Sequence, residues 1–414
     1  MAYTETTTNS LGNRLSGSIR GMGVGLLLII IGTGLLWWNE GDFVATGGAL
    51  TEAQSVTQEL GNTATLNTAL NGQLVHAIGL ADTEEALTDP VFQVSTKAIR
   101  LERTVEYFQW QEKSKSEKKK KLGGGEETVT TYTYATGWTS RPVNSTAFHD
   151  PEAARSKVNT TLMSLEDSKI QASSVRFGAY RLPDFLVNSI SGAVSMAVSV
   201  PAETLEKLNK SLEPAAELDG AWVQTDWNQQ SQQKAVSMVH VSGGTIYIGK
   251  APASPSVGDV RVTFKEVPFA TVSILAKLHG DSFEAYRANN GKSVSSLRMG
   301  SVSVENMYSA AHDSNEMITW ILRIAGTLAV IGGLRMIFAP LAVVASIIPL
   351  LGTLVGAGVG LASVLVGAAW SLLVVAIAWL RFRPLIGGIM LAVAAGLVVL
   401  LYIKGKVAKK PNAA

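Results

Sequence analysis

Two arginines lie inside a stretch of sequence that is otherwise apolar enough to cross a membrane. Arg323 and Arg335 both fall within residues 317–338, and a guanidinium group can bind a carboxylate or a phosphate through two parallel N–H groups. A charge in hydrocarbon is costly, so each arginine needs a partner or a route to the membrane surface. Twelve helical residues separate the two, a rise of about 18 Å. We expect Arg335 to anchor at the interface and Arg323 to bind a partner in the helix bundle or a lipid phosphate.

No enzymatic motif accompanies these cations. The sequence has no cysteine and five scattered histidines, which excludes disulfides and thiolate sites and argues against a histidine metal site. Phosphate-binding loops, zinc-protease helices and nucleophile elbows are absent as well. We therefore expect a protein that is not an enzyme, with no catalytic residues, no metal and no cofactor.

The composition is that of a membrane protein. Of 414 residues, 47% are hydrophobic and 16% are charged, and the apolar residues gather toward the two ends of the chain. A run of about 20 apolar residues predicts a helix that crosses the bilayer. The fold class expected is an integral membrane α-helical protein with four spans and a large β-rich α+β extracytoplasmic domain. The spans are predicted at 21–38, 317–338, 350–380 and 385–403.

Two parts of this layout need a further choice. Residues 339–349 contain two prolines and predict an interfacial or re-entrant segment, centred on 341–348, and 381–384 predict a turn before the last span. A cleaved signal peptide is the alternative for the first span. Trp37 and Trp38 favour a retained anchor, because an aromatic pair is typical of a membrane interface.

Flanking charges predict the orientation of the spans. Residues 1–20 and 404–414 carry arginines and lysines, whereas acidic residues border residues 39–316. Positive residues favour the cytoplasmic side, so both tails are expected in the cytoplasm and residues 39–316 outside. Arg381 and Arg383 lie on the outer turn and count against this orientation, but the tails outnumber them.

Small and aromatic residues mark the helix surfaces. Gly352, Gly356 and Gly360 recur every four residues in the third predicted span, and such a stripe allows close helix packing. It predicts packing against neighbouring spans, self-association between protomers, or the lining of a pore, and the residues alone leave these open. Trp320, near the start of the second span, is expected to contact lipid or the helix bundle.

Residues 39–316 read mainly as strands, forming one domain or two modules. A long antiparallel hairpin is predicted around a lysine-rich tip, 113–127, which we expect to be solvated and flexible. Residues 182–197 repeat apolar side chains on one helical face and predict either a core helix or a helix lying on the outer leaflet. Further strands are predicted at 73–80, 237–249, 258–267 and 269–280, and short helices after Asp150 and from Pro201.

Several short motifs occur in order along nearly the whole chain. They include "NEG" at 39–41, "LVHAIG" at 74–79, "EYFQW" at 106–110, "YTYATGW" at 132–138, "VGDVRVTF" at 257–264 and "SNEMITWILRIAG" at 314–326. With these motifs the chain resembles the transmembrane protein 43 family, also called LUMA. The resemblance implies one anchor, a large lumenal or extracytoplasmic domain and three C-terminal spans. It also implies, from the animal members, a scaffold of the endoplasmic reticulum and inner nuclear membrane that self-associates.

The departures from this family indicate a bacterial member: the lysine-rich hairpin, the absence of cysteine and the alanine- and glycine-rich spans. We therefore expect a multi-pass protein of the bacterial cytoplasmic membrane with its large domain in the periplasm. The expected function is a non-enzymatic scaffold that binds membrane lipids, forms homo-oligomers and recruits membrane or envelope proteins, with no nucleic acid partner. The alternative is a channel or transport component built on the glycine-rich third span.

Overall fold

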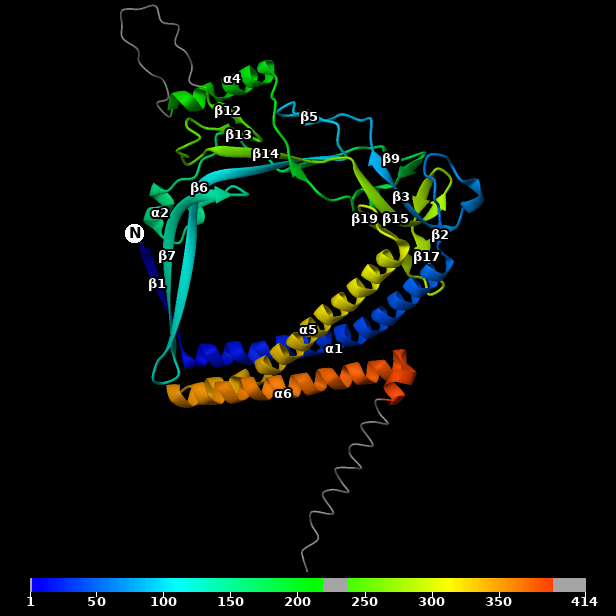
Figure 1. Cartoon of the computed structure of the whole chain (residues 1–414). Helices are drawn as coiled ribbons and strands as arrows, with labels where there is room; N and C mark the ends of the chain where they lie inside the picture. The colour runs from blue at the N-terminus through cyan, green and yellow to red at the C-terminus, as the bar shows by residue number, and fades with distance from the viewer. Residues whose placement is uncertain (1, 219–236, 390–414) are drawn as a thin grey trace, which may run out of the picture.

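Three long helices underlie a β-rich region in the computed structural model, which describes residues 2–218 and 237–389 (Figure 1). The helices are α1 (Leu11–Val56), α5 (Val304–Ala345) and α6 (Pro349–Phe382), and together we call them the helical layer. Within the described residues these three are long and apolar enough to cross a membrane. The sequence predicts a fourth span at 385–403, which from residue 390 onward lies outside the described residues.

The ends of these helices follow local sequence signals. The hydroxyl groups of Ser10 and Ser303 accept hydrogen bonds from backbone N–H groups of the first turn of α1 and α5, the usual role of an N-cap serine. α5 does not end near residue 338 but continues through Pro340 to Ala345, with α1 and α6 packed against it; a proline is tolerated inside such packed apolar helices. The chain then turns over residues 346–348, and Pro349 begins α6, where its missing N–H is not needed.

Helices α1 and α5 are antiparallel and approach closely at glycines. A Cβ atom on Gly25 would lie 2.6 Å from the carbonyl oxygen of Gly333, and one on Gly32 would lie 2.8 Å from that of Gly326. Both distances are too short for any larger residue without a backbone shift. The glycines are seven residues apart in each helix, which keeps them on one face. This spacing fixes the register of the two helices.

The larger sheet has the order β1-β7-β6-β14-β13-β12, with β11 paired to β14 and β8 paired to β6. All of these pairings are antiparallel. The predicted long hairpin is confirmed as β6 and β7. The bounds are β1 Ala2–Asn9, β6 Arg100–Lys120, β7 Glu126–Thr139, β8 Ser168–Gln171, β11 Val194–Ser195, β12 Val239–Ser242, β13 Thr245–Ile248 and β14 Val260–Val267.

The smaller sheet has the order β10-β9-β3-β15-β16, with β19 paired to β15 and β2 paired in parallel to β3. Its strands are β2 Gln58–Glu59, β3 Leu74–Asp82, β9 Val175–Phe177, β10 Tyr180–Leu182, β15 Ala270–His279, β16 Ser282–Glu284 and β19 Ser296–Met299. Two small ribbons pair β4 (Leu87–Thr88) with β5 (Ser95–Thr96) and β17 (Tyr286–Arg287) with β18 (Ser293–Val294). Short helical segments are η1 Thr68–Leu70, η2 Ser145–Ala147, α2 Pro151–Ser156, α3 Asp184–Val187 and α4 Ala202–Leu218.

One continuous hydrophobic core joins the two sheets. Buried Val75 and Ile274 of the smaller sheet belong to the same cluster as Val105, Ile246 and Val262 of the larger one. Alternate residues of β14 point into this core, as the alternating sequence predicts. A single core thus runs through the β-rich region between α1 and α5, and we call this region the β-arch.

The β-arch meets the helical layer at two places (Figure 1). At one end, α1 and α5 enter it through a second, smaller core that includes Leu50, Leu275, Met307 and Tyr308; we call this the apolar joint. At the other end a three-stranded ribbon, made of residues 2–9, 113–120 and 126–133, extends from the arch to the start of α1.

The tip of this ribbon is ordered by contacts with the helices. The strands continue through Lys120, so the turn covers only 121–125 rather than all of 113–127. Gly123 and Gly124 both have positive φ, a backbone conformation that suits glycine. The N–H of Gly123 donates to the carbonyl of Ile347 at 3.1 Å. The tip therefore contacts the α5–α6 turn, while its lysine side chains are exposed as predicted; those of Lys115 and Lys118 are 81% and 69% exposed.

Residues 182–197 also differ from expectation. They form a single helical turn, α3, and the short strand β11 rather than one helix. Leu186 and Ile190 are nevertheless buried in the main core. The apolar pattern therefore reports burial correctly, while Pro183 before α3 and Gly192 at positive φ break the helix that the pattern suggests.

Candidate functional site

Arg323 has a carboxylate partner inside the helical layer. Its Nε lies 2.6 Å from Oε1 of Glu40, and its second N–H group donates to Oε2 at 2.8 Å. The side chain of Glu40 is 1% exposed and that of Arg323 is 16% exposed. Such a paired geometry satisfies both carboxylate oxygens. Of the two partners predicted for Arg323, the structure contains the one in the bundle.

The pairing follows from the glycine contact between α1 and α5. That register places the residues after Trp38 opposite the start of the apolar part of α5, where the amide of Asn39 donates to the carbonyl of Thr319 at 3.2 Å. The third helix adds a further donor, because Nε1 of Trp379 lies 2.7 Å from Oε2 of Glu40. All three helices therefore meet at Glu40.

Aromatic rings surround the guanidinium group. Its central carbon lies 4.9 Å from the ring of Trp320 and 5.7 Å from that of Trp379, distances at which a cation is attracted to a ring face. Trp320, which the sequence singles out, thus lies beside Arg323, and Trp379 was missed. The rings shield the ion pair from the surroundings.

Further charged side chains lie at this end of the helical layer. Arg381 and Arg383 follow closely in the chain, and the guanidinium of Arg383 lies 4.2 Å from the ring of Phe43. Asp42, the next carboxylate along α1, pairs with Lys292 of the β-arch. Glu40 therefore pairs with Arg323 and interacts electrostatically with a second arginine, Arg383. The guanidinium groups of Arg381 and Arg383 are chemically able to bind an anion such as a phosphate.

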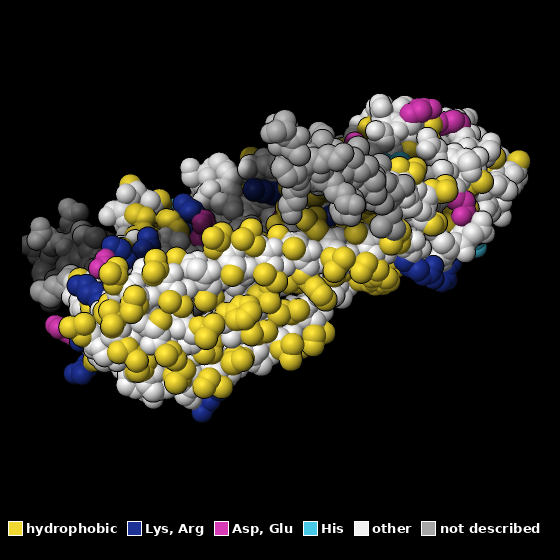
Figure 2. Space-filling view, turned by 90° about the horizontal axis from the view of Figure 1, so that it is seen from below, with side chains coloured by type: hydrophobic (Ala, Val, Ile, Leu, Met, Phe, Trp, Pro, Cys, Tyr) yellow, Lys and Arg dark blue, Asp and Glu magenta, His cyan; other side chains and the backbone are white. Residues whose placement is uncertain are grey.

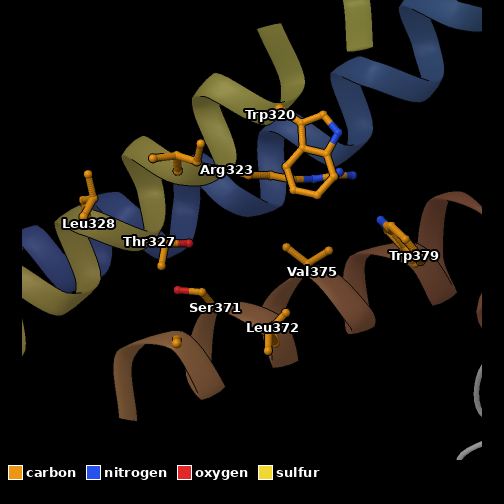
Figure 3. A pocket seen from close by; sticks show the side chains of 10 residues that line it. Trp320, Arg323, Thr327, Leu328, Ser371, Leu372, Val375 and Trp379 are labelled. Carbon is orange, nitrogen blue, oxygen red and sulfur yellow. The ribbon is translucent and has the colours of Figure 1, made fainter. Parts of the chain in front are cut away.

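A groove of about 450 Å³ begins at Arg323 and runs between α5 and α6 (Figure 3). Its walls are mainly apolar and include Leu328, Leu372 and Val375. The hydroxyl of Ser371 on the wall donates to the carbonyl of Gly367 at 2.8 Å, so it is already used within α6. A long apolar groove with a cation at one end has the shape and chemistry to hold a lipid acyl chain.

The other predicted site residues lie elsewhere. Arg335 is exposed near the far end of α5, and Trp38 is 56% exposed, while Trp37 packs edge-on against Phe382. A Cβ on Gly352 would lie 2.4 Å from Cα of Ser346, and one on Gly356 would touch Ala342 at 3.8 Å. These two glycines pack within the chain.

Gly360 has open space where a Cβ would be. The stripe is therefore only partly used by internal packing. The glycines that matter most for the α1–α5 contact, Gly25, Gly32, Gly326 and Gly333, were missed. Their seven-residue spacing in both apolar runs is the signal that could have found them.

The charge pattern presents Glu40 only as a flanking residue. A further signal exists, because Glu40 lies two residues after a continuous apolar run and could be matched with Arg323 at the same depth of an antiparallel helix. Within the described residues no group of three or more histidine, aspartate or glutamate side chains is placed to hold a metal ion. The residues around Glu40 are suited to neutralising the charge of Arg323 and to contacting lipid.

Comparison with known proteins gives one consistent result. A family model described as "Transmembrane protein 43" matches residues 107–384. The mouse (Mus musculus) protein named "Transmembrane protein 43" is 29% identical over 382 residues, covering 90% of this chain and 87% of its own length. The fruit fly (Drosophila melanogaster) "Transmembrane protein 43 homolog" is 24% identical over 383 residues, covering 89% and 90%. No solved structure matches.

Proposed function

The chain belongs to the transmembrane protein 43 family, and we propose that it acts as a non-enzymatic scaffold that holds the β-arch at a fixed position against the membrane. The observation that carries this proposal is the attachment of the arch at both of its ends. The apolar joint fixes one end of the arch to α1 and α5. The ribbon fixes the other end to the start of α1 and to the α5–α6 turn.

Two attachments restrict the arch more than one would. A domain joined through a single linker can rotate about it. A domain held at two separated places keeps one face toward the lipid and the other toward partners. The continuous core between the sheets supports the same conclusion, because it leaves no hinge between the two attachments. A rigidly held β-arch is suited to presenting one surface to partner proteins.

Membrane lipids are the first partners that we propose. Arg381 and Arg383, which follow Trp379 of α6 in the chain, favour an anionic headgroup, and the groove that begins at Arg323 favours an acyl chain. Trp320 and Trp38, both more than half exposed, are suited to contact lipid at the interface. The ion pair itself would then serve to keep α1, α5 and α6 together.

Self-association and protein partners complete the proposal. Gly360 on α6 has open space beside it and offers a close approach to a second copy. We place the arch on the periplasmic side of a bacterial cytoplasmic membrane, following the lysines of residues 404–414. Membrane or envelope proteins on that side are the expected partners of the arch.

Photo-crosslinking in living cells tests this function. A photoreactive amino acid replaces Leu80, which is 50% exposed on the β-arch, or Leu365, which is 62% exposed on α6. We expect discrete protein adducts at Leu80. At Leu365 we expect lipid adducts, together with adducts to a second copy. The matched control replaces Phe92, which is 0% exposed in the core, and should give none.

Three results would contradict the scaffold. Ion conductance of the purified protein in liposomes, lost on Gly356→Leu, would establish the channel alternative. Turnover of a lipid by the pure protein would establish an enzyme. Absence of any protein adduct at Leu80 and at other exposed arch positions would also count against it.

A further inference from the structure

We propose that the N-terminal strand, the ribbon and the β-arch all lie on one face of the membrane, and that the helical layer enters the adjacent leaflet from that face without α1 crossing the bilayer. This goes beyond the scaffold function and concerns how the chain sits in lipid. The partner of the apolar underside is then the hydrocarbon of one leaflet.

Both ends of α1 are attached to the same β-arch. After its C-terminal end the chain enters β2 and β3 of the smaller sheet. Before its N-terminal end, all eight residues of β1 pair with β7, from Ala2 opposite Thr133 to Asn9 opposite Glu126. A helix that crossed a bilayer between these points would leave β1 and β7 on opposite faces.

Further contacts close the N-terminal end. Arg14 in the first turn of α1 donates to the carbonyl of Gly124 and, at 3.0 Å, to the hydroxyl of Ser346. Its guanidinium lies 3.7 Å from the carboxylate of Glu126. Lys120 reaches Thr353 of α6 at 3.2 Å. The start of α1, the ribbon tip and the α5–α6 turn therefore form one contact, which we call the polar foot.

The ribbon cannot pass through the bilayer to reach this foot. Among the described strands, β1 and residues 113–120 are both edges with no further partner, and open edges in hydrocarbon leave backbone N–H and C=O groups unsatisfied. Exposed lysines line the same segment; the side chains of Lys115 and Lys118 are 81% and 69% exposed. The ribbon must run through water, so the polar foot is on the arch side.

The opposite side of the helical layer is suited to lipid. Seen from below, hydrophobic side chains cover the lower surface, and lysines and arginines lie at its edges (Figure 2). On α6 the side chains of Leu354, Leu365 and Leu372 are 70%, 62% and 71% exposed. Two layers of packed helices measure about 20 Å from their interaxial distance and diameter, against roughly 15 Å for the hydrocarbon of one leaflet. The layer is therefore thick enough to fill the hydrocarbon of one leaflet and to reach into its headgroup region, with α6 deepest.

Charges in the helical layer fit this placement. Glu40 neutralises Arg323, and exposed Arg20 and Arg335, near the polar foot, can reach lipid headgroups. The orientation predicted from basic residues assumes that each apolar run crosses the bilayer. Without a crossing by α1, Arg14 and Arg20 serve as contacts to the ribbon and the headgroups instead of marking the cytoplasm.

The absence of native cysteine permits a direct test with single-cysteine variants. Thr8→Cys lies on β1, Ser114→Cys on the ribbon and Ala285→Cys on the β-arch, and all three positions are exposed. The full chain is kept in sealed, carbonate-washed membrane vesicles of one orientation and treated with a membrane-impermeant maleimide. We expect all three to be labelled from the same face. A protein enclosed in the vesicles serves as the control for leakage.

The result that overturns the proposal is equally clear. If Thr8→Cys is labelled only after the vesicles are permeabilised, while Ser114→Cys is labelled before, then α1 crosses the bilayer. If Ala285→Cys and Ser114→Cys are then still labelled from the same face, the scaffold function stands although the placement of α1 is disproved. The two proposals can therefore be tested independently.

A double variant provides an independent measurement. Thr6 lies directly opposite Val129, so Thr6→Cys/Val129→Cys should form an intramolecular disulfide on oxidation in intact membranes. The matched control, Thr6→Cys/Ala285→Cys, should not. Loss of the disulfide in the first pair, with the single variants still present in the membrane, would contradict the pairing of β1 with β7.

Discussion

The two ends of the helical layer are held by opposite kinds of contact. At the apolar joint and the nearby ion pair, Met307 and Tyr308 are 0% and 1% exposed and Glu40 is 0% exposed. At the polar foot, the contacts are hydrogen bonds made by a partly exposed arginine and an exposed lysine. Buried contacts contribute most to the free energy of unfolding, whereas partly exposed polar contacts contribute little. The apolar joint and the ion pair should therefore determine the stability of the fold. The polar foot should determine only the position of the ribbon.

The ion pair should give the largest effect. Glu40→Gln leaves the guanidinium of Arg323 without a carboxylate and should lower the free energy of unfolding by about 3 kcal/mol, measured by chemical unfolding in detergent. Glu316→Gln, at an exposed position of α5, is the matched control and should change it little. Glu40→Gln/Arg323→Met should recover part of the loss. If Glu40→Gln and Glu316→Gln were equally stable, the ion pair would contribute as little to the free energy of unfolding as an exposed polar contact.

The apolar joint should come next. Met307→Ala leaves a cavity among Leu50, Leu275 and Tyr308 and should cost about 2–3 kcal/mol. Met317→Ala removes the same side chain where it is 59% exposed, and thermal unfolding should show almost no change. If Met317→Ala lowered the stability as much as Met307→Ala, burial in the apolar joint would not be the source of the effect.

The glycine contact between α1 and α5 gives a sharper control. Gly32→Ala places a methyl group 2.8 Å from the carbonyl oxygen of Gly326, whereas Gly34→Ala meets nothing within 4 Å. We expect Gly32→Ala to destabilise by about 1–3 kcal/mol through overpacking, and Gly34→Ala to be neutral or stabilising because alanine favours helix. The order of the two melting temperatures tests this, and the reverse order would disprove the close approach.

The polar foot should respond locally. Arg14→Ala removes the hydrogen bonds to Gly124 and Ser346 and should cost about 1 kcal/mol. Because this opening is local, amide hydrogen exchange should rise in residues 121–125 while the melting temperature hardly moves. Arg20→Ala, an exposed arginine of the same helix, should leave exchange unchanged. A global loss of stability would contradict the contrast between the ends.

The smallest effect concerns pH where the ribbon leaves the arch. Burial, together with the hydrogen bond to Glu112, raises the pKa of Tyr134 from 10 to about 12. A raised pKa in the folded state means that the neutral form contributes stability below about pH 10 and that this contribution is lost between about pH 10 and 12. The stability difference between the native chain and Tyr134→Phe should shrink over this window. A constant difference would show that the hydroxyl group does not matter.

The hydrogen bonds of Glu112 also act at low pH. Burial alone would raise the pKa of Glu112, but hydrogen bonds from Tyr134 and His149 lower it below its ordinary value. Its contribution is therefore present above the ordinary pKa of a glutamate and is lost as pH falls through the lowered value. Tyr134→Phe should weaken this acid dependence as well.

Local patterns in the sequence determined the elements of this protein. Apolar runs predicted the three helices, alternation predicted the hairpin and the main strands, and Asp150 before Pro151 predicted the start of α2. These features depend on residues a few positions apart, because side-chain periodicity and capping are local properties of helices and strands. The sequence also identified Arg323 as a residue in need of a partner.

Only the tertiary structure decided which partner that is. Glu40 is 283 residues from Arg323 in the chain, and Arg14 is 332 residues from Ser346. Such contacts depend on the register of α1 against α5 and on the closure of the ribbon onto the helices. The glycine spacing sets the register of α1 against α5, and a turn sets where the ribbon meets the helices. A plot of hydrophobicity along the sequence does not reveal either contact. For the same reason the apolar runs could reveal membrane helices but could not reveal that both ends of α1 return to one β-arch.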